Sequence, residues 1–234
     1  MKPLIEIRNL TKEYGIGDAK VKALNDISLS IEEGEFLVVL GSSGSGKSTL
    51  LNMIGAMDMP TCGDVLYEGE SIISINKKKR CEFRRNNIGF IFQNFSLIPD
   101  LTAKENVELT ASFSKNSVDT VEYLKMVGLA NKLNNYPSEL SGGEQQRVGI
   151  ARALVKESKI ILLDEPTGAL DSESGKNILK LLIDIKKQYN KTIILVTHTK
   201  EISYLASRII TMKNGMIYND EINDNPIDLE DIKW

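Results

Sequence analysis

A short apolar run continues without interruption into a glycine-rich loop in FLVVLGSSGSGKS, residues 36–48. The apolar part, residues 36–40, is typical of a strand covered on both faces, as in a parallel sheet with helices on either side. Residues 41–48 fit GxxxxGK[ST], whose glycines let successive backbone N–H groups point at phosphate oxygens. A flexible Gly/Ser turn is the alternative, and the complete motif after a strand favours a phosphate site.

This loop predicts binding of a nucleoside triphosphate. We expect a helix to begin near Lys47 and to direct its N-terminal dipole at the phosphates. Lys47 is then expected to reach the β- and γ-phosphates, and the hydroxyl of Ser48 to hold Mg²⁺. Kinases, GTPases and helicases share such loops, so other residues must identify the activity.

Two further apolar runs, Ile160 to Leu163 and Ile193 to Val196, also read as buried strands. Between them, residues 178–185 carry apolar side chains at i, i+3, i+4 and i+7, the spacing of an amphipathic helix. Strand, helix and strand in this order indicate an α/β fold with a mostly parallel sheet. Such sheets favour chemistry at the C-terminal ends of their strands.

Three candidate catalytic or metal-binding residues follow these strands directly. Asp164 is placed to bind the shell of Mg²⁺, and Glu165 to polarise a water for attack on the γ-phosphate. His198 is the single histidine, and it can donate a hydrogen bond to the γ-phosphate. A surface acid pair and a structural histidine are the alternatives, and the upstream phosphate loop favours the functional reading.

A second glycine-containing motif, LSGGEQQR at residues 140–147, opens an apparent helix through Leu154. Small residues at a helix start let the backbone approach a phosphate. The loop at 41–48 already supplies one phosphate site. The second helix start is therefore expected to contact the nucleotide that a partner copy binds.

At these residues the chain resembles the ATP-binding cassette family, and the resemblance covers nearly the whole sequence. The motifs also follow the family's order, with Phe92-Gln93 between the phosphate loop and LSGGEQQR. The resemblance implies a P-loop NTPase core with a β subdomain, at about 1–74 and 158–218, and a helical subdomain at about 75–157. An acidic tail at 219–234 is expected to be solvated and partly ordered.

The resemblance also implies further roles. Tyr14 would stack on adenine, Gln93 would contact Mg²⁺ or the attacking water, and Asp171 would lie in a loop that links two sites. Ser141 and Gly143 of one copy would complete the ATP site of a second copy in a head-to-tail homodimer. The ATP-contacting set is then Tyr14, Gly41, Ser42, Gly44, Ser45, Gly46, Lys47, Ser48, Thr49, Ser141, Gly143 and Asp171.

Within the family, the segments around Phe92–Pro99 and Thr167–Asp171 are similar to the branch of macrolide-exporter, lipoprotein-releasing and cell-division cassettes. That branch is associated with mechanotransmission through a separate membrane permease. Thr199 departs from the pattern, since relatives usually carry Asp, Asn or Glu there, and this puts the bracing of the His198 loop in question.

Composition excludes several other classes. The chain has 29 Lys and Arg against 32 Asp and Glu, and a net charge of −3 argues against nucleic-acid binding by global charge. The basic run at 77–80 is best explained as a solvated helix face near the membrane partner. The first residues carry charges where a signal peptide needs an apolar run, and no apolar run approaches the roughly 20 residues of a membrane span.

We therefore expect an ATPase that works with a permease at the cytoplasmic face of a membrane. The alternative is a soluble cassette ATPase of DNA repair, cluster assembly or translation. Repair types carry long coiled coils between the two motifs, and translation types carry two cassettes, and neither feature is present here. A regulatory module without hydrolysis would be expected to have lost Glu165 or His198, and both are present.

Overall fold

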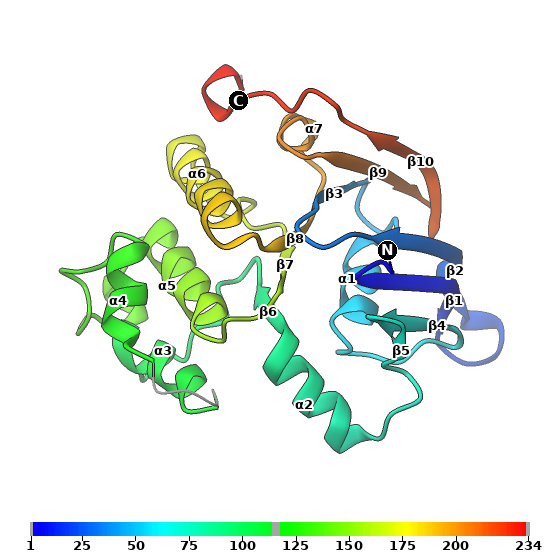
Figure 1. Ribbon diagram of the computed structural model, residues 1–234, viewed down its shortest axis with the longest axis horizontal. Helices are drawn as coiled ribbons and strands as arrows, with labels where there is room; N and C mark the ends of the chain where they lie inside the picture. The colour runs from blue at the N-terminus through cyan, green and yellow to red at the C-terminus, as the bar shows by residue number, and fades with distance from the viewer. Residues whose placement is uncertain (1, 114–117, 233–234) are drawn as a thin grey trace. The chain divides into compact units, whose positions relative to one another are not determined.

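The computed structural model describes residues 2–113 and 118–232, which form two compact units. The first unit joins the chain up to Arg84 with the chain from Thr192 onward, and the second runs from Arg85 to Lys191. Figure 1 labels the elements of both. The subdomain boundaries given by the resemblance remain a prediction.

The N-terminal part of the first unit is a four-stranded antiparallel sheet in the order β2-β1-β4-β5. In β1, shifts in register after Ile7 interrupt the alternation of buried and exposed side chains. Asn9, at one of these shifts, has a positive φ of 46°. The strands are Ile5–Tyr14 (β1), Val21–Ile31 (β2), Cys62–Tyr67 (β4) and Glu70–Ser71 (β5).

Two parallel strands of the first unit, β3 and β8, are buried on both faces, as their apolar runs predict. β3 (Phe36–Leu40) lies between β8 (Thr192–Thr197) and β9 (Arg208–Lys213) and is parallel to both. Leu40 is the register partner of Thr197, so the loops after β3 and β8 leave the sheet at the same edge. Helix α1 (Lys47–Ile54) packs against β8, and the short α7 (Lys200–Ser203) packs against β3.

A tight hairpin joins β9 to β10 (Met216–Ile222). Its two central residues, Asn214 and Gly215, have φ of 51° and 74°, as expected of a type I′ turn. β10 extends four residues into the segment predicted to be a solvated acidic tail, so that part of the tail is a strand. Trp234 lies outside the described residues.

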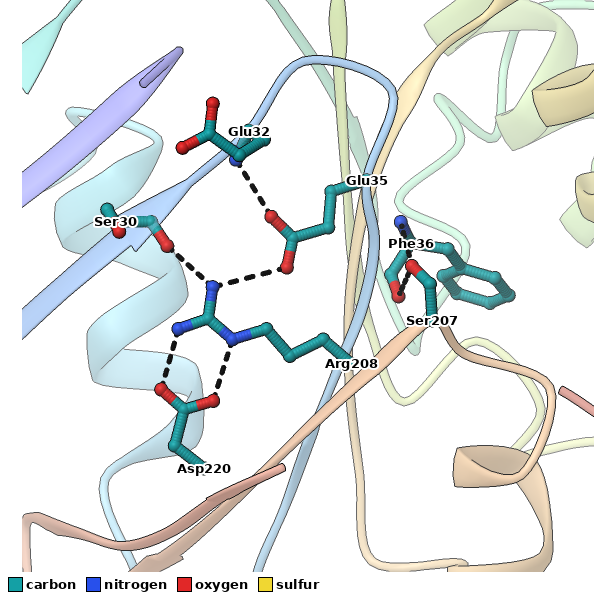
Figure 2. Close-up of polar contacts among 7 residues, drawn as sticks. All are labelled: Ser30, Glu32, Glu35, Phe36, Ser207, Arg208 and Asp220. Atoms are coloured by element: carbon teal, nitrogen blue, oxygen red, sulfur yellow. Dashed lines mark hydrogen bonds and ion pairs between the residues drawn. The ribbon is translucent and has the colours of Figure 1, made fainter. Parts of the chain in front are cut away.

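The extension of β10 is fixed by Arg208, whose guanidinium binds Asp220 through two hydrogen bonds of 2.7 and 2.6 Å (Figure 2). The same guanidinium donates to the carbonyl of Ser30 at 2.8 Å and to the carboxylate of Glu35 at 3.3 Å. The Asp220 hydrogen bond raises the pKa of Arg208. This cluster connects the last hairpin to the chain between β2 and β3.

Among its described residues, the second unit places four complete helices around a pair of parallel strands, β6 and β7. α5 contacts the other three helices and β6, and thus forms the centre of this unit. Within the segment expected to be helical, β6 was missed. Its bounds and those of the remaining elements are Ile88–Ile91 (β6), Ile160–Asp164 (β7), Ala103–Ala111 (α3), Thr120–Met126 (α4), Gly142–Leu154 (α5) and Ser172–Tyr189 (α6). α2 (Lys77–Asn87) contains the boundary between the units.

Candidate functional site

The loop between β3 and α1 can be built only from glycine at two positions. A Cβ on Gly41 would lie 2.7 Å from the carbonyl oxygen of Met212, and one on Gly46 would lie 2.5 Å from that of Ala23. Gly46 is also the N-cap of α1, with φ of 103° and no side-chain cap. The first N–H groups of α1 therefore have no side chain capping them at this end of the helix.

The polar side chains of this loop fit a polyanion. The ammonium of Lys47 is buried and donates to the carbonyl oxygens of Gly41 at 2.8 Å and Ser42 at 3.0 Å. The hydroxyl of Ser45 is buried without a hydrogen-bond partner among the described residues. Phosphate oxygens would satisfy this hydroxyl and would offer Lys47 charged acceptors in place of neutral carbonyls.

Ser48 and Thr49 lie in the first turn of α1, with Ser48 exposed. His198 directly follows β8 and is exposed, so it leaves the sheet at the edge where the phosphate loop begins. The loop after His198 is braced by Thr197, whose hydroxyl oxygen accepts from the N–H of Thr199 at 3.1 Å. Thr199 is the N-cap of α7 and makes no side-chain cap to it.

Tyr14 ends β1 with a ring held by two neighbours that sequence reasoning missed. Its hydroxyl donates to the carboxylate of Asp58 at 2.8 Å, and the ammonium of Lys12 lies 4.7 Å from the ring centroid. Lys12 also binds Asp58 at 2.9 Å. Partial burial and then the Asp58 hydrogen bond raise the pKa of Tyr14, which keeps the phenol neutral. The ring is 42% exposed, so it can stack on a flat ligand.

In the second unit, the signature residues cap their own helix. Ser141 is the N-cap of α5, and its oxygen accepts from the N–H of Glu144 at 3.2 Å. The Glu144 carboxylate accepts in return from the N–H of Ser141 at 2.8 Å, and this bond lowers the pKa of Glu144. The Ser141 side chain also makes a weaker hydrogen bond to the Glu144 carboxylate, so its hydroxyl hydrogen can be donated to an anion only in place of Glu144. A Cβ on Gly143 would lie 3.2 Å from the hydroxyl of Ser174 in α6.

The candidate catalytic residues of the second unit lie around the end of β7. Asp164 is the last residue of β7, and Glu165 follows it with φ of 47°, a left-handed conformation that costs a non-glycine residue about 1 kcal/mol. Gly168 donates its N–H to the carbonyl of Glu165 at 3.1 Å. The side-chain nitrogen of Gln93 lies 3.1 Å from where a Cβ on Gly168 would be. Gln93 therefore lies against the turn that Glu165 begins.

Asp171 is the N-cap of α6, where its carboxylate accepts from the N–H of Ser174 at 2.9 Å. This bond lowers the pKa of Asp171. Thus the first unit carries Tyr14, the phosphate loop and His198, and the second carries Gln93, Ser141, Gly143, Asp164, Glu165 and Asp171. Among the residues that the structure describes, no three His, Cys, Asp or Glu side chains cluster as a metal site, and the Mg²⁺ role of Ser48, Gln93 and Asp164 remains a prediction.

A family model described as ABC transporter matches residues 24–168. The chain belongs to the ABC transporter family. It is 48% identical over 219 residues to an uncharacterised ABC transporter ATP-binding protein of Methanocaldococcus jannaschii, covering 92% of this chain and 97% of that one. It is 44% identical to the macrolide export ATP-binding/permease protein of Wolinella succinogenes, covering 92% of this chain and 34% of that protein.

A solved cassette superposes on this ABC chain with a TM-score of 0.87 at 41% identity, over 94% of this chain and 99% of the other. That structure is a dimer in a post-hydrolysis state with bound ADP and phosphate. The fold is therefore the P-loop cassette fold that the motifs predict. Among the described helices of this chain, none combines the length and the apolar character of a membrane span.

Proposed function

We propose that the chain is the ATP-hydrolysing motor subunit of a transporter, in which two copies close around two ATP molecules and drive a separate membrane permease. One observation carries this proposal. The same chain holds a phosphate loop suited to bind nucleotide and a second, self-capped helix start, whose Ser141 hydroxyl can turn from Glu144 to an anion. A complete ATP site needs the phosphate loop of one copy and the signature helix of another, and two copies supply both parts.

In the first step, the phosphate loop binds ATP. Lys47 exchanges the carbonyls of Gly41 and Ser42 for the β- and γ-phosphates, and the hydroxyl of Ser45 gains an acceptor. Ser48, Asp164 and Gln93 are the residues that would hold Mg²⁺, which neutralises charge on the phosphates when bound. The ring of Tyr14, held by Lys12 and Asp58, offers a face for adenine.

In the second step, the chain's own groups act on the γ-phosphate. Glu165 orients and polarises a water, and its left-handed backbone is fixed by the turn to Gly168. His198 donates a hydrogen bond to the γ-phosphate from the end of β8, the strand beside β3. Ser141 and Gly143 of the second copy close the site, and Asp171, at the start of α6, links the two sites. Hydrolysis removes the γ-phosphate contacts, and the dimer reopens.

The relatives support coupling to a permease. The Wolinella succinogenes relative is named an ATP-binding/permease protein, and this chain spans about a third of it. We place the chain at the cytoplasmic face of a membrane, held there by its permease, in export, lipoprotein or lipid extraction, antibiotic resistance or mechanotransmission. The competing function is a soluble cassette ATPase without a permease.

The experiment compares tagged Glu165→Gln and Glu165→Gln/Lys47→Ala proteins, each incubated with MgATP and detergent-solubilised membranes of the source organism. Glu165→Gln should keep ATP and the closed dimer while turnover falls by about a hundredfold or more. An integral membrane protein retained with Glu165→Gln and lost with the Lys47→Ala control supports the permease partner. Soluble partners alone, retained in the same ATP-dependent way, would favour the soluble cassette.

A further inference from the structure

Arg152, in the last turns of the signature helix α5, is partly buried, with backbone carbonyls as its partners. Its two terminal nitrogens donate to the carbonyl oxygen of Ser96 at 2.7 Å and to that of Phe95 at 3.2 Å. No carboxylate among the described residues forms an ion pair with it, and burial alone lowers its pKa. A buried cation costs desolvation free energy, which an apolar side chain of similar length would avoid. The guanidinium fork, however, can hold two successive carbonyls at once.

The segment that Arg152 holds has an unusual backbone. Phe95 and Ser96 are consecutive non-glycine residues with φ of 56° and 50°, in the left-handed region that L-residues avoid. Phe95 also donates its N–H to the carbonyl of Phe92 at 3.3 Å, which makes residues 92–96 a tight turn. Two such residues in a row persist only where the surrounding structure fixes them.

The turn is attached to α5 at two levels. The tip of the Phe95 ring lies 3.5 Å from where a Cβ on Gly142 would be, at the start of the helix. The Phe95 carbonyl oxygen lies 3.6 Å from where a Cβ on Gly149 would be, and Arg152 follows Gly149 by one helical turn on the same face. The chain at 95–96 therefore runs along α5 from the signature glycine to the guanidinium.

Gln93 lies in this turn, two residues before Phe95, and its side-chain nitrogen lies against Gly168, close to Glu165. We propose that Arg152 is a positioning residue, which fixes the turn at Phe95 and Ser96 so that Gln93 reaches the Glu165 turn. Through this contact, the position of the signature helix sets the position of Gln93. The inference rests on the roles proposed above for Gln93 and Glu165.

The test is a double-mutant cycle on MgATP hydrolysis with wild type, Arg152→Lys, Gln93→Ala and the double variant. Lysine keeps the charge and loses the fork, so we expect kcat to fall about tenfold with KM for ATP changed less than about twofold. In the Gln93→Ala background, Arg152→Lys should cause no further loss, because its effect passes through Gln93. Lys191→Met is the matched control. It removes another part-buried cation that donates to a backbone carbonyl of this unit, that of Ser158 at 2.7 Å, and should leave kcat unchanged.

Thermal unfolding of each variant separates positioning from folding, and Arg152→Gln replaces Arg152→Lys if the lysine variant does not fold. If the losses of Arg152→Lys and Gln93→Ala multiply in the double variant, or if Lys191→Met lowers kcat equally, the positioning role is wrong. If Gln93→Ala alone leaves kcat unchanged, the proposed role of Gln93 fails first, and the inference for Arg152 falls with it. These failures are distinct from wild-type turnover in Glu165→Gln, which would overturn the proposed function itself.

Discussion

The two helix starts that define this chain, those of α1 and α5, differ in how their N-terminal N–H groups are satisfied. α1 begins at Gly46, which has a left-handed φ of 103° and no side-chain cap. α5 begins at Ser141, in a reciprocal capping box with Glu144. A helix end without a side-chain cap can give its N–H groups to an anion, whereas a capped end has already used part of its donor capacity.

This difference supports the proposal that the α1 start binds nucleotide alone and that the α5 start acts only as a second contact. At α1, backbone N–H groups, Lys47 and the unpartnered Ser45 hydroxyl are all suited to the same anion. At α5, the N-cap offers one hydroxyl hydrogen, and the Glu144 carboxylate beside it repels anions. The α5 start should therefore add to a phosphate site that α1 of another copy has already formed.

The largest expected effect comes from breaking the α1 start. Gly46→Ala places a Cβ 2.5 Å from the Ala23 carbonyl at a positive φ, so we expect ATP affinity to fall on the order of a hundredfold and folding to weaken. Gly128→Ala is the matched control, because Gly128 also has a positive φ, has no atom within 4 Å of the new Cβ and lies outside the ATP-contacting set. It should cost about 1 kcal/mol of stability. Isothermal titration measures the ATP affinity of each variant, and thermal unfolding measures its stability. Equal losses of ATP affinity in the two variants would contradict the close-approach argument.

A smaller effect should follow from Ser141→Ala. Removal of the cap should cost about 1 kcal/mol of stability and reduce ATP-dependent dimerisation about tenfold, without changing ATP binding by the monomer. Thr102→Ala removes an equivalent capping box at α3, formed with Glu105. Thr102→Ala should lose about as much stability as Ser141→Ala and leave ATP-dependent dimerisation unchanged. Sedimentation with and without ATP distinguishes them, and a weakened dimer in both would show that the cap matters only for folding.

The smallest effect concerns the charge of the α5 cap. The pKa of Glu144 is lowered from 4.5, first by the hydrogen bond from the Ser141 N–H. Its ionised form thus stabilises the fold above about pH 4.5, and this contribution is lost as pH falls through the lower folded pKa. The stability difference between wild type and Glu144→Gln should shrink between about pH 6 and pH 3. Urea unfolding across that range checks this, and a constant difference would contradict the shift.

Sequence reasoning succeeded where local pattern alone decides structure. The apolar run at residues 36–40 coincides with β3, and the helix expected to open in LSGGEQQR and run through Leu154 is α5. These features depend on a few neighbouring residues. The family motifs identified the candidate site residues, and the structure distributes these residues over the two units. Their catalytic roles remain proposals.

The features that sequence reasoning missed depend on distant contacts. β6 contains Gly89, which weakens a strand pattern, yet a Cβ there would lie 3.0 Å from the Ala153 carbonyl of α5. β10 extends into acidic sequence because Asp220 pairs with Arg208. Asp58 holds Tyr14 from 44 residues away, and Arg152 holds the turn at Phe95 from 57 residues away. Neither pair leaves a local signal in the sequence.

The central claim is that the α1 start of one copy and the α5 start of another form one ATP site. It is tested most directly by mixing two inactive variants, Lys47→Ala and Ser141→Arg, and measuring MgATP hydrolysis. Each variant alone has no intact composite site, whereas a mixed dimer combines the intact phosphate loop of the Ser141→Arg copy with the intact signature of the Lys47→Ala copy. We predict that activity returns on mixing and rises with the concentration of either variant. A mixture as inactive as its components, beside an active wild type, would contradict the shared site.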